Sequence, residues 1–439
     1  MKPCILSIML LLIIGLKSAY CQTITFDLPD QKGKMIYLVA FKGIKQDTIF
    51  SGQIDEKGAL TFTPSKNEPL SSGVVVLFIK PDIRYNFIYS NKENPTLHAE
   101  GGFTAQNIHF RNSPENDFIT SKYGEQMERT GKIMFLKQGM QLYKPDEKLY
   151  PLFQEEKSKL EAQQAVFDTM LQQKSGNLYS ARLLALQNLI NSYVTRLQGN
   201  ADTAEVDRIR GYMLRKLDME TLYRSSMWFS CINGLLEIYY KPSPFYGQFG
   251  SDIVALLQKT QSQEVFLALA NDAATICSQY SWNIDEAVLS NYLSQSGRVV
   301  NPQGKLKKML EVYKLQPGMT APPIAGINLS NGKTETLLVF FETGCNSCDN
   351  EINRLIGNYP VLKSKRIEVV TISSDIDTAV YNNNAKRFPW KTKLCDFKGF
   401  AGKNFQNYAI IGTPTMYMID KTGTIQGKYA NLSEIETIK

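Results

Sequence analysis

The stretch FFETGCNSCDNEINRL, residues 340–355, holds two cysteines, Cys345 and Cys348, with two residues between them. An apolar run precedes the pair, and apolar residues recur after it with the period of a helix. The stretch therefore predicts a buried strand, a turn that carries the thiols, and then a helix. Such thiols can form a redox couple, contribute half of a metal site, or be incidental, and the function of the chain depends on which of these holds.

The predicted position of the two cysteines gives them different reactivities. The first amides of a helix have no partner within it, so they favour negative charge and lower the pKa of a thiol placed there. Cys345, at the helix start, should be exposed and acidified, whereas Cys348, one turn further, should be shielded. We therefore expect Cys345 to attack a partner disulfide and Cys348 to resolve the mixed disulfide.

Glu351 follows Cys348 by three residues, on the same face of the predicted helix. A partly buried carboxylate there is suited to accept and return the Cys348 proton. The same spacing also fits an ordinary solvated acid in the first turns of a helix, where it complements the helix dipole. Spacing alone leaves both interpretations open.

The residues around the pair predict an α/β domain. Apolar runs at 336–342, 366–375, 413–420 and 424–430 alternate with segments of helical pattern. Continuous apolar runs are typical of strands that are covered on both faces. Within the third run, Pro414 follows Thr413 at the strand start, and a cis bond there would expose the Thr413 backbone to an extended peptide.

Taken together, these features resemble the thioredoxin fold. They are APPI at 321–324, the strand–CxxC–helix unit, Glu351, an inserted helix and TPTMYMID at 413–420. More narrowly, the segment is similar to the periplasmic TlpA/ResA-like thiol–disulfide oxidoreductases. The resemblance implies a redox-active disulfide between Cys345 and Cys348, a proton-relay acid at Glu351, and a cis proline at Pro414 that follows Thr413 in the substrate-binding loop.

The segment departs from the family pattern at several positions. Gly344 replaces the usual aromatic residue before the first cysteine, Val339 replaces the buried aspartate of ordinary thioredoxin, and Asn346 and Ser347 replace its Gly-Pro pair. The reduction potential of the family therefore cannot be assumed for the Cys345–Cys348 pair. Cys395 has no role in the family pattern and is interpreted as a core or half-buried residue.

The preceding chain divides by pattern into a β and a helical part. Short alternating runs, beginning with TITFDL at 23–28, predict a small antiparallel sandwich or barrel over 22–112. Helical patterning over 113–300 begins at NSPENDF, where Ser113 can cap a helix. The prediction is a multidomain chain: an N-terminal all-β domain, a central all-α domain, and a thioredoxin domain over 315–439. NSPENDF is typical of multidomain exported proteins of Bacteroidetes-type bacteria, which this order of domains resembles.

The N-terminus predicts export. Lys2 precedes an apolar core that is shorter than the ~20 residues of a membrane-spanning helix, and Ala19 lies three residues before Gln22. We expect a signal peptide over 1–21 and a protein of the periplasm or cell envelope. Lipid attachment at Cys21 is the alternative, although the bulky Tyr20 does not suit it. Thiols outside the cytoplasm face an oxidising environment, so a Cys345–Cys348 dithiol there must be kept reduced or be used as an oxidant.

Composition argues against several other classes. The net charge of +7 is spread along 439 residues and forms no basic patch, which argues against nucleic acid binding. His98 and His109 are interpreted as strand residues, and no second ligand pair accompanies the CxxC, so no metal site or cofactor is expected. Cys231 and Cys277 lie in helical patterns and are interpreted as buried residues rather than a bridge.

The sequence therefore predicts an exported thiol–disulfide oxidoreductase that exchanges disulfides with envelope proteins and receives electrons from a membrane or periplasmic donor. Two alternatives remain open. One is a non-catalytic binding or scaffold protein with a thioredoxin-like domain. The other is a thiol-dependent peroxidase with antioxidant activity, although a peroxiredoxin has Thr three residues before its cysteine, whereas Thr343 lies two before Cys345. The client and the direction of electron flow are not predicted.

Overall fold

The structure is a computed structural model that describes residues 22–435 apart from 66–69, 105, 198–201, 241–242, 326 and 331. The expected signal peptide, with Cys21, lies outside the described residues. The chain forms two compact units, one of residues 1–246 and 258–266 and the other of 247–257 and 267–439. The division into three domains made from the sequence stays a prediction.

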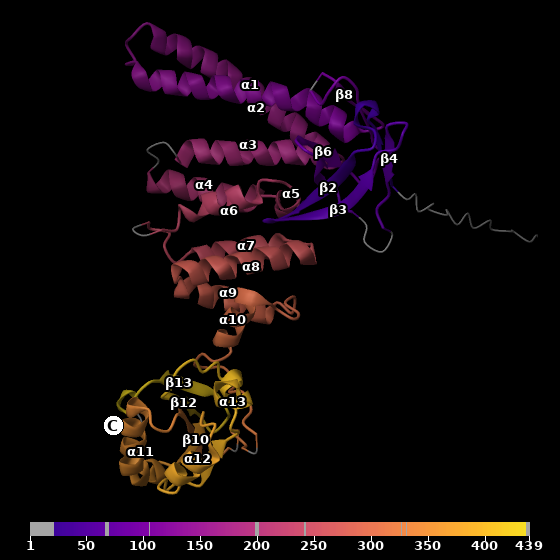
Figure 1. The fold of residues 1–439 in the computed structure, drawn as a ribbon. Coiled ribbons are helices and arrows are strands. Elements are labelled where there is room, and N and C mark those ends of the chain that lie inside the picture. The colour runs from indigo at the N-terminus through magenta and orange to yellow at the C-terminus, as the bar shows by residue number, and fades with distance from the viewer. Residues whose placement is uncertain are drawn as a thin grey trace, which may run out of the picture. The chain divides into compact units, whose positions relative to one another are not determined.

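Two four-stranded sheets open the first unit (Figure 1). One has the order β4-β1-β7-β8 and the other the order β3-β2-β5-β6. Their bounds are β1 Ile24–Asp27, β2 Met35–Lys42, β3 Lys45–Gln53, β4 Ala59–Phe62, β5 Gly73–Ile79, β6 Ile83–Tyr89, β7 Thr96–Ala99 and β8 Ile108–Arg111.

Alternation along the strands builds the core shared by the two sheets. Ile24, Phe26 and Leu28 are fully buried and pack with the inward residues of the other sheet, as TITFDL predicts. The expected antiparallel arrangement is wrong at one pairing, because β1 and β7 run parallel. His98 of β7 pairs in register with His109 of β8, so both histidines are strand residues, as predicted.

Ten α-helices follow the sheets in the described residues before the next strand. α1 to α4 are Pro114–Leu142, Leu149–Ser175, Tyr179–Leu197 and Thr203–Lys216. α5 to α7 are Met219–Tyr223, Trp228–Leu236 and Phe249–Lys259. α8 to α10 are Gln263–Tyr280, Asn283–Gln295 and Gly304–Tyr313. Cys231 and Cys277 are buried and unpaired in α6 and α8, as predicted, and burial raises the pKa of both thiols.

Burial makes Cys231 and Cys277 poor nucleophiles, because a thiol with a raised pKa carries little thiolate at neutral pH. Neither residue is therefore a candidate for disulfide exchange. No helix among the described residues is long and apolar enough to cross a membrane.

The first helix begins where the sequence predicts. Ser113 is the N-cap of α1, and its side chain accepts a hydrogen bond from the Asn116 amide. Pro114 occupies the first helical position, which needs no amide hydrogen. Asp202 caps α4 in the same way, by accepting a hydrogen bond from the Glu205 amide.

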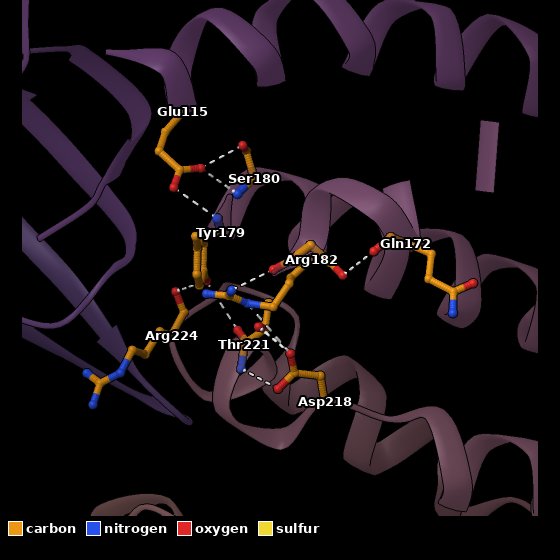
Figure 2. Close-up of polar contacts among 9 residues, drawn as sticks. Glu115, Gln172, Tyr179, Ser180, Arg182, Asp218, Thr221 and Arg224 are labelled. Atoms are coloured by element: carbon orange, nitrogen blue, oxygen red, sulfur yellow. Dashed lines mark hydrogen bonds and ion pairs between the residues drawn. The ribbon is translucent and has the colours of Figure 1, made fainter. Parts of the chain in front are cut away.

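The two residues after Pro114 connect α1 to other parts of the first unit. The buried Glu115 carboxylate accepts hydrogen bonds from the Tyr179 amide at 2.9 Å and from the Ser180 amide at 2.8 Å, at the start of α3 (Figure 2). The Asn116 side chain bonds both backbone groups of Ile88 in β6, accepting from the amide at 2.8 Å and donating to the carbonyl at 2.7 Å. The motif NSPENDF thus fixes the start of α1 against a sheet and a second helix.

Glu93 supplies a pH-dependent contact at the same junction. It accepts hydrogen bonds from the Ser113 hydroxyl at 2.8 Å and from the Glu115 amide at 3.3 Å. Burial, opposed by these two bonds, raises the pKa of Glu93 from 4.5 to about 7. Because the folded state holds this proton more tightly than the unfolded chain, the contribution of Glu93 to stability is fully present below pH 4.5 and is lost as the pH rises through about 7.

We predict that Glu93→Gln removes this component of the pH dependence. Urea unfolding between pH 4 and 8 should show wild-type stability falling relative to the variant across the window from 4.5 to about 7. Glu155→Gln, on the exposed surface of α2, is the control and should follow wild type at every pH. Parallel curves for wild type and Glu93→Gln would contradict the assignment.

The C-terminal part of the second unit has a five-stranded sheet of order β11-β10-β9-β12-β13 (Figure 1). β9, β10 and β11 are parallel, whereas β12 and β13 are antiparallel to their neighbours. The strands are β9 Glu335–Phe341, β10 Ile367–Ser373, β11 Thr392–Cys395, β12 Thr415–Ile419 and β13 Ile425–Tyr429. The helices are α11 Asn346–Ser364, α12 Thr378–Ala385 and α13 Lys403–Asn407.

This sheet is covered on both faces, as its continuous apolar runs predict. Along β9, Leu337 and Val339 belong to one buried cluster, whereas Leu338 and Phe340 belong to another. α13 is short, and a 3-10 turn at Gly399–Ala401 precedes it. The sheet order and its helices form a thioredoxin-like fold.

Candidate functional site

The two cysteines lie at the start of α11, directly after the central strand β9. Cys345 is the N-cap of the helix, and its carbonyl accepts a hydrogen bond from the Asp349 amide at 2.9 Å. Its side chain is partly exposed, whereas Cys348 is fully buried in the core between α11 and the sheet. The sequence predicts this difference in exposure, and it leaves one thiol within reach of a partner protein.

Burial raises the pKa of Cys348 to about 11. Hydrogen bonds from the Thr413 side chain and from the Glu342 backbone oppose this effect, whereas a hydrogen bond and charge repulsion from Cys345 add to it. Cys345 packs against the buried cluster that contains Cys348. Both are free thiols in this structure.

Thr413 and Pro414 lie at the beginning of β12, beside the thiol pair. β12 pairs with β9 and brings Thr415 opposite Phe340, close to the turn that carries Cys345. The peptide bond between Thr413 and Pro414 is cis. The structure thus brings together four of the five site residues that the sequence predicts: the two cysteines, Thr413 and Pro414.

Glu351 is buried, with its carboxylate held by two other groups. One oxygen lies 2.9 Å from the Arg354 guanidinium, and the other accepts a hydrogen bond from the Leu432 amide at 2.8 Å. These contacts connect α11 to the C-terminal turn of the domain. They give Glu351 a structural role, and its role as a proton acceptor for Cys348 stays a prediction.

The turn between β9 and Cys345 explains one departure from the family pattern. Gly344 has a φ of +82°, in the left-handed region that glycine adopts without a steric cost. An aromatic residue at this position would be strained in the turn as it stands. Val339 is fully buried within β9, so the strand supplies no carboxylate there.

Sequence reasoning missed the residue that anchors this turn, Asp375. Its buried carboxylate accepts hydrogen bonds from the Thr343 amide at 3.1 Å and the Thr343 hydroxyl at 2.7 Å. Its position in the sequence could have indicated this role. Polar residues that follow a buried parallel strand gather at the same sheet edge as the CxxC turn.

Cys395 ends β11 at this same edge and is half-buried. Its thiol donates a hydrogen bond to the Asp375 carbonyl at 3.2 Å, and burial raises its pKa. A protonated, hydrogen-bonded thiol fits the interpretation of Cys395 as a semi-buried residue. Among the described residues, no group of three or more His, Cys, Asp or Glu side chains is arranged to hold a metal ion.

Comparisons with known proteins agree on the C-terminal part of the chain. Residues 322–428 match the AhpC/TSA family. ResA, the thiol–disulfide oxidoreductase of Bacillus thuringiensis subsp. konkukian, is 28% identical over 120 residues, which cover 26% of this chain and 68% of that protein. ResA of Bacillus anthracis is 27% identical over 120 residues, with the same coverage of both chains.

Solved structures also align with this part of the chain. A thiol–disulfide oxidoreductase from Bacteroides fragilis NCTC 9343 is 29% identical, with a TM-score of 0.20, and covers 22% of this chain and 72% of its own. A thioredoxin-like protein from Parabacteroides distasonis ATCC 8503 is 17% identical, with a TM-score of 0.25, and covers 27% of this chain and 91% of its own.

The C-terminal part of the chain is a thioredoxin-fold domain of the oxidoreductase class. Residues 322–428 of this part match the AhpC/TSA family. The sequence predicts the similarity to the ResA proteins, which the comparison confirms.

Proposed function

We propose that the chain is a thiol–disulfide oxidoreductase that exchanges disulfides with protein clients through Cys345 and Cys348. The observation that carries the proposal is the pairing of a partly exposed thiol at a helix N-terminus with a fully buried thiol one turn further, in the cluster against which the first thiol packs. As the N-cap of α11, Cys345 lies at the end of the helix where the backbone amides have no partner within the helix. The buried partner is protected from external reagents and remains available to close the disulfide.

The first step is attack of the Cys345 thiolate on one sulfur of a client disulfide. A sulfur–sulfur bond forms between Cys345 and the client, the client disulfide breaks, and its second sulfur leaves as a thiolate that takes up a proton. Thr413, half-buried two residues before β12, hydrogen-bonds to Cys348 and is suited to pair its backbone with the client chain.

The second step is attack of the Cys348 thiolate on the Cys345 sulfur. The Cys345–Cys348 disulfide forms, the client leaves as a dithiol, and two electrons have passed from the protein to the client. Cys348 must first lose its proton, which its burial disfavours.

Glu351 is the proposed acceptor of the Cys348 proton, and Glu351→Gln tests this role. The variant keeps an oxygen for the Leu432 amide but loses the basic carboxylate. We predict that it slows closure of the Cys345–Cys348 disulfide by about tenfold or more. Rapid-mixing experiments with a fluorescent mixed disulfide measure this step separately from the first attack. An unchanged closure rate would leave Glu351 with only its structural role.

A specific contact disfavours the peroxidase alternative. The Thr343 hydroxyl donates to Asp375 at 2.7 Å and accepts from the Asn384 side chain at 3.0 Å, so its single hydrogen is used within the protein. A threonine that stabilises a bound peroxide needs its hydroxyl directed at the substrate. Thiol-dependent peroxide consumption, measured beside disulfide reduction, distinguishes the two activities.

The proposal is tested by redox titration and by trapping a client. The purified protein should interconvert between dithiol and disulfide in glutathione or dithiothreitol buffers, with mass spectrometry assigning the bond to Cys345 and Cys348. Cys348→Ser should accumulate a mixed disulfide with a model client, because the resolving thiol is missing. If the wild-type pair stays reduced in every buffer and the variant traps nothing, a binding or scaffold function is favoured instead.

We also infer that the exchange takes place in the periplasm or cell envelope, with envelope proteins as clients and a membrane or periplasmic electron donor. The signal-like residues 1–21 support export. Fractionation of cells that express the full chain tests this. A soluble periplasmic pool agrees with cleavage before Gln22, and a lipid-labelled membrane pool agrees with attachment at Cys21.

A further inference from the structure

Asp375 lies at the centre of a buried hydrogen-bond network next to the thiol pair. Besides its two bonds from Thr343, its carboxylate accepts from the Ser373 hydroxyl at 2.6 Å. Ser373 in turn accepts from the Asp375 amide at 3.0 Å. The end of β10 thus presents a fully hydrogen-bonded carboxylate to the turn that carries Cys345, two residues beyond Thr343.

The network continues from this turn to the two helices beside it. Asn384 of α12 donates to the Thr343 hydroxyl at 3.0 Å and accepts from the Arg387 guanidinium at 2.8 Å. Arg387 also bonds the Asn353 side chain at 2.8 Å and lies 3.7 Å from the Asp349 carboxylate, both on α11. The inserted helix α12 is therefore joined to the turn before Cys345 and to the first turns of the helix after it.

We propose that Asp375 is a positioning residue that, through Thr343, holds the Cys345 sulfur against the N-terminus of α11. The proposal rests on the proposed exchange function and extends it to a second structural element. Gly344, between Thr343 and Cys345, is conformationally permissive and adds little restraint of its own to the turn. Without the anchor at Thr343, the turn is free to move Cys345 away from the α11 amides.

The physical consequence concerns reactivity more than stability. The helix amides stabilise the thiolate only when the sulfur stays near them, since this effect falls off within the first turn. A displacement of about 1 Å at a reacting group can cost on the order of 10²-fold in rate. Loss of the anchor should therefore slow attack by Cys345 and, by destabilising the reduced thiolate form, make the couple more reducing.

The test measures alkylation of Cys345 by iodoacetamide at pH 7 in a Cys348→Ser, Cys395→Ser background. Thr343→Val removes the hydroxyl and keeps the shape, and it should lower the second-order rate constant about tenfold. Thr343→Ser keeps the hydroxyl and should restore most of the rate. Thr336→Val is the matched control, because the buried Thr336 hydroxyl at the start of β9 has no hydrogen-bond partner among the described residues. Its rate constant should equal that of the background.

A second measurement separates positioning from a purely structural role. In the otherwise wild-type chain, Thr343→Val and Asp375→Asn should shift the Cys345–Cys348 reduction potential to more negative values. If Asp375→Asn does not fold, Thr343→Val alone decides the question. Wild-type alkylation rates and potentials in a Thr343→Val variant that only melts earlier would overturn the proposal. The alkylation requires no client, so it is informative even if the wild-type protein reduces no protein disulfide.

Discussion

Cys345→Ser should lower the rate of client disulfide reduction by roughly 10³-fold or more, the scale expected when an enzyme loses its nucleophile. A serine hydroxyl does not ionise near neutral pH, so the α11 N-terminus has no anion to stabilise. Cys348 cannot replace it, because its side chain is fully buried and its pKa is raised to about 11. The measurement is steady-state reduction of a model client disulfide under a thiol donor, with wild type and variant at equal concentration.

Cys395→Ser is the matched control for this prediction. It makes the same substitution in the same domain, and serine can still donate to the Asp375 carbonyl, as the thiol does. The control should retain the wild-type rate. Equal activity of wild type and Cys345→Ser would place the reactive sulfur elsewhere, and inactivity of all three proteins would favour a binding function for the domain.

Asn116→Ala should lower the free energy of unfolding by roughly 2–6 kcal/mol. The estimate follows because the variant leaves both backbone groups of Ile88 without their partner, and each buried group left unsatisfied costs about 1–3 kcal/mol. Aspartate has a similar shape but cannot replace Asn116 without a loss of stability, because its carboxylate would repel the Ile88 carbonyl. Urea unfolding followed by circular dichroism measures the change.

Asn177→Ala, at an exposed position after α2, controls for the substitution itself and should change stability by less than about 0.5 kcal/mol. A similar small effect for Asn116→Ala would show that water or neighbouring groups replace the lost hydrogen bonds.

The sequence predicts well those features that depend on local pattern. Continuous apolar runs identify β9 and β10, the alternating TITFDL run identifies β1, and Ser113 caps a helix where expected. β3 was not predicted, because its residues are mostly polar and exposed and give no apolar alternation. The thiol pair was recognisable because its spacing and its place between strand and helix are local properties.

Contacts between residues distant in the sequence could not be predicted in this way. Asp375 reaches Thr343 across 32 positions, and Glu115 reaches Ser180 across 65. In each case, the two bonded groups come close together only when the chain folds. The role of Glu351 was ambiguous for the same reason, because its bond to the Leu432 amide spans 81 positions.

The contact of Asn116 with β6 also bears on association between chains. β6 lies at one margin of its sheet, where exposed backbone groups can recruit a strand from another molecule and start aggregation. The Asn116 amide occupies the outward-facing groups of Ile88 and so interrupts the row that an incoming strand would need. Once α1 has formed, an incoming strand cannot pair with Ile88, so the side chain that secures the helix also interrupts this margin of the sheet.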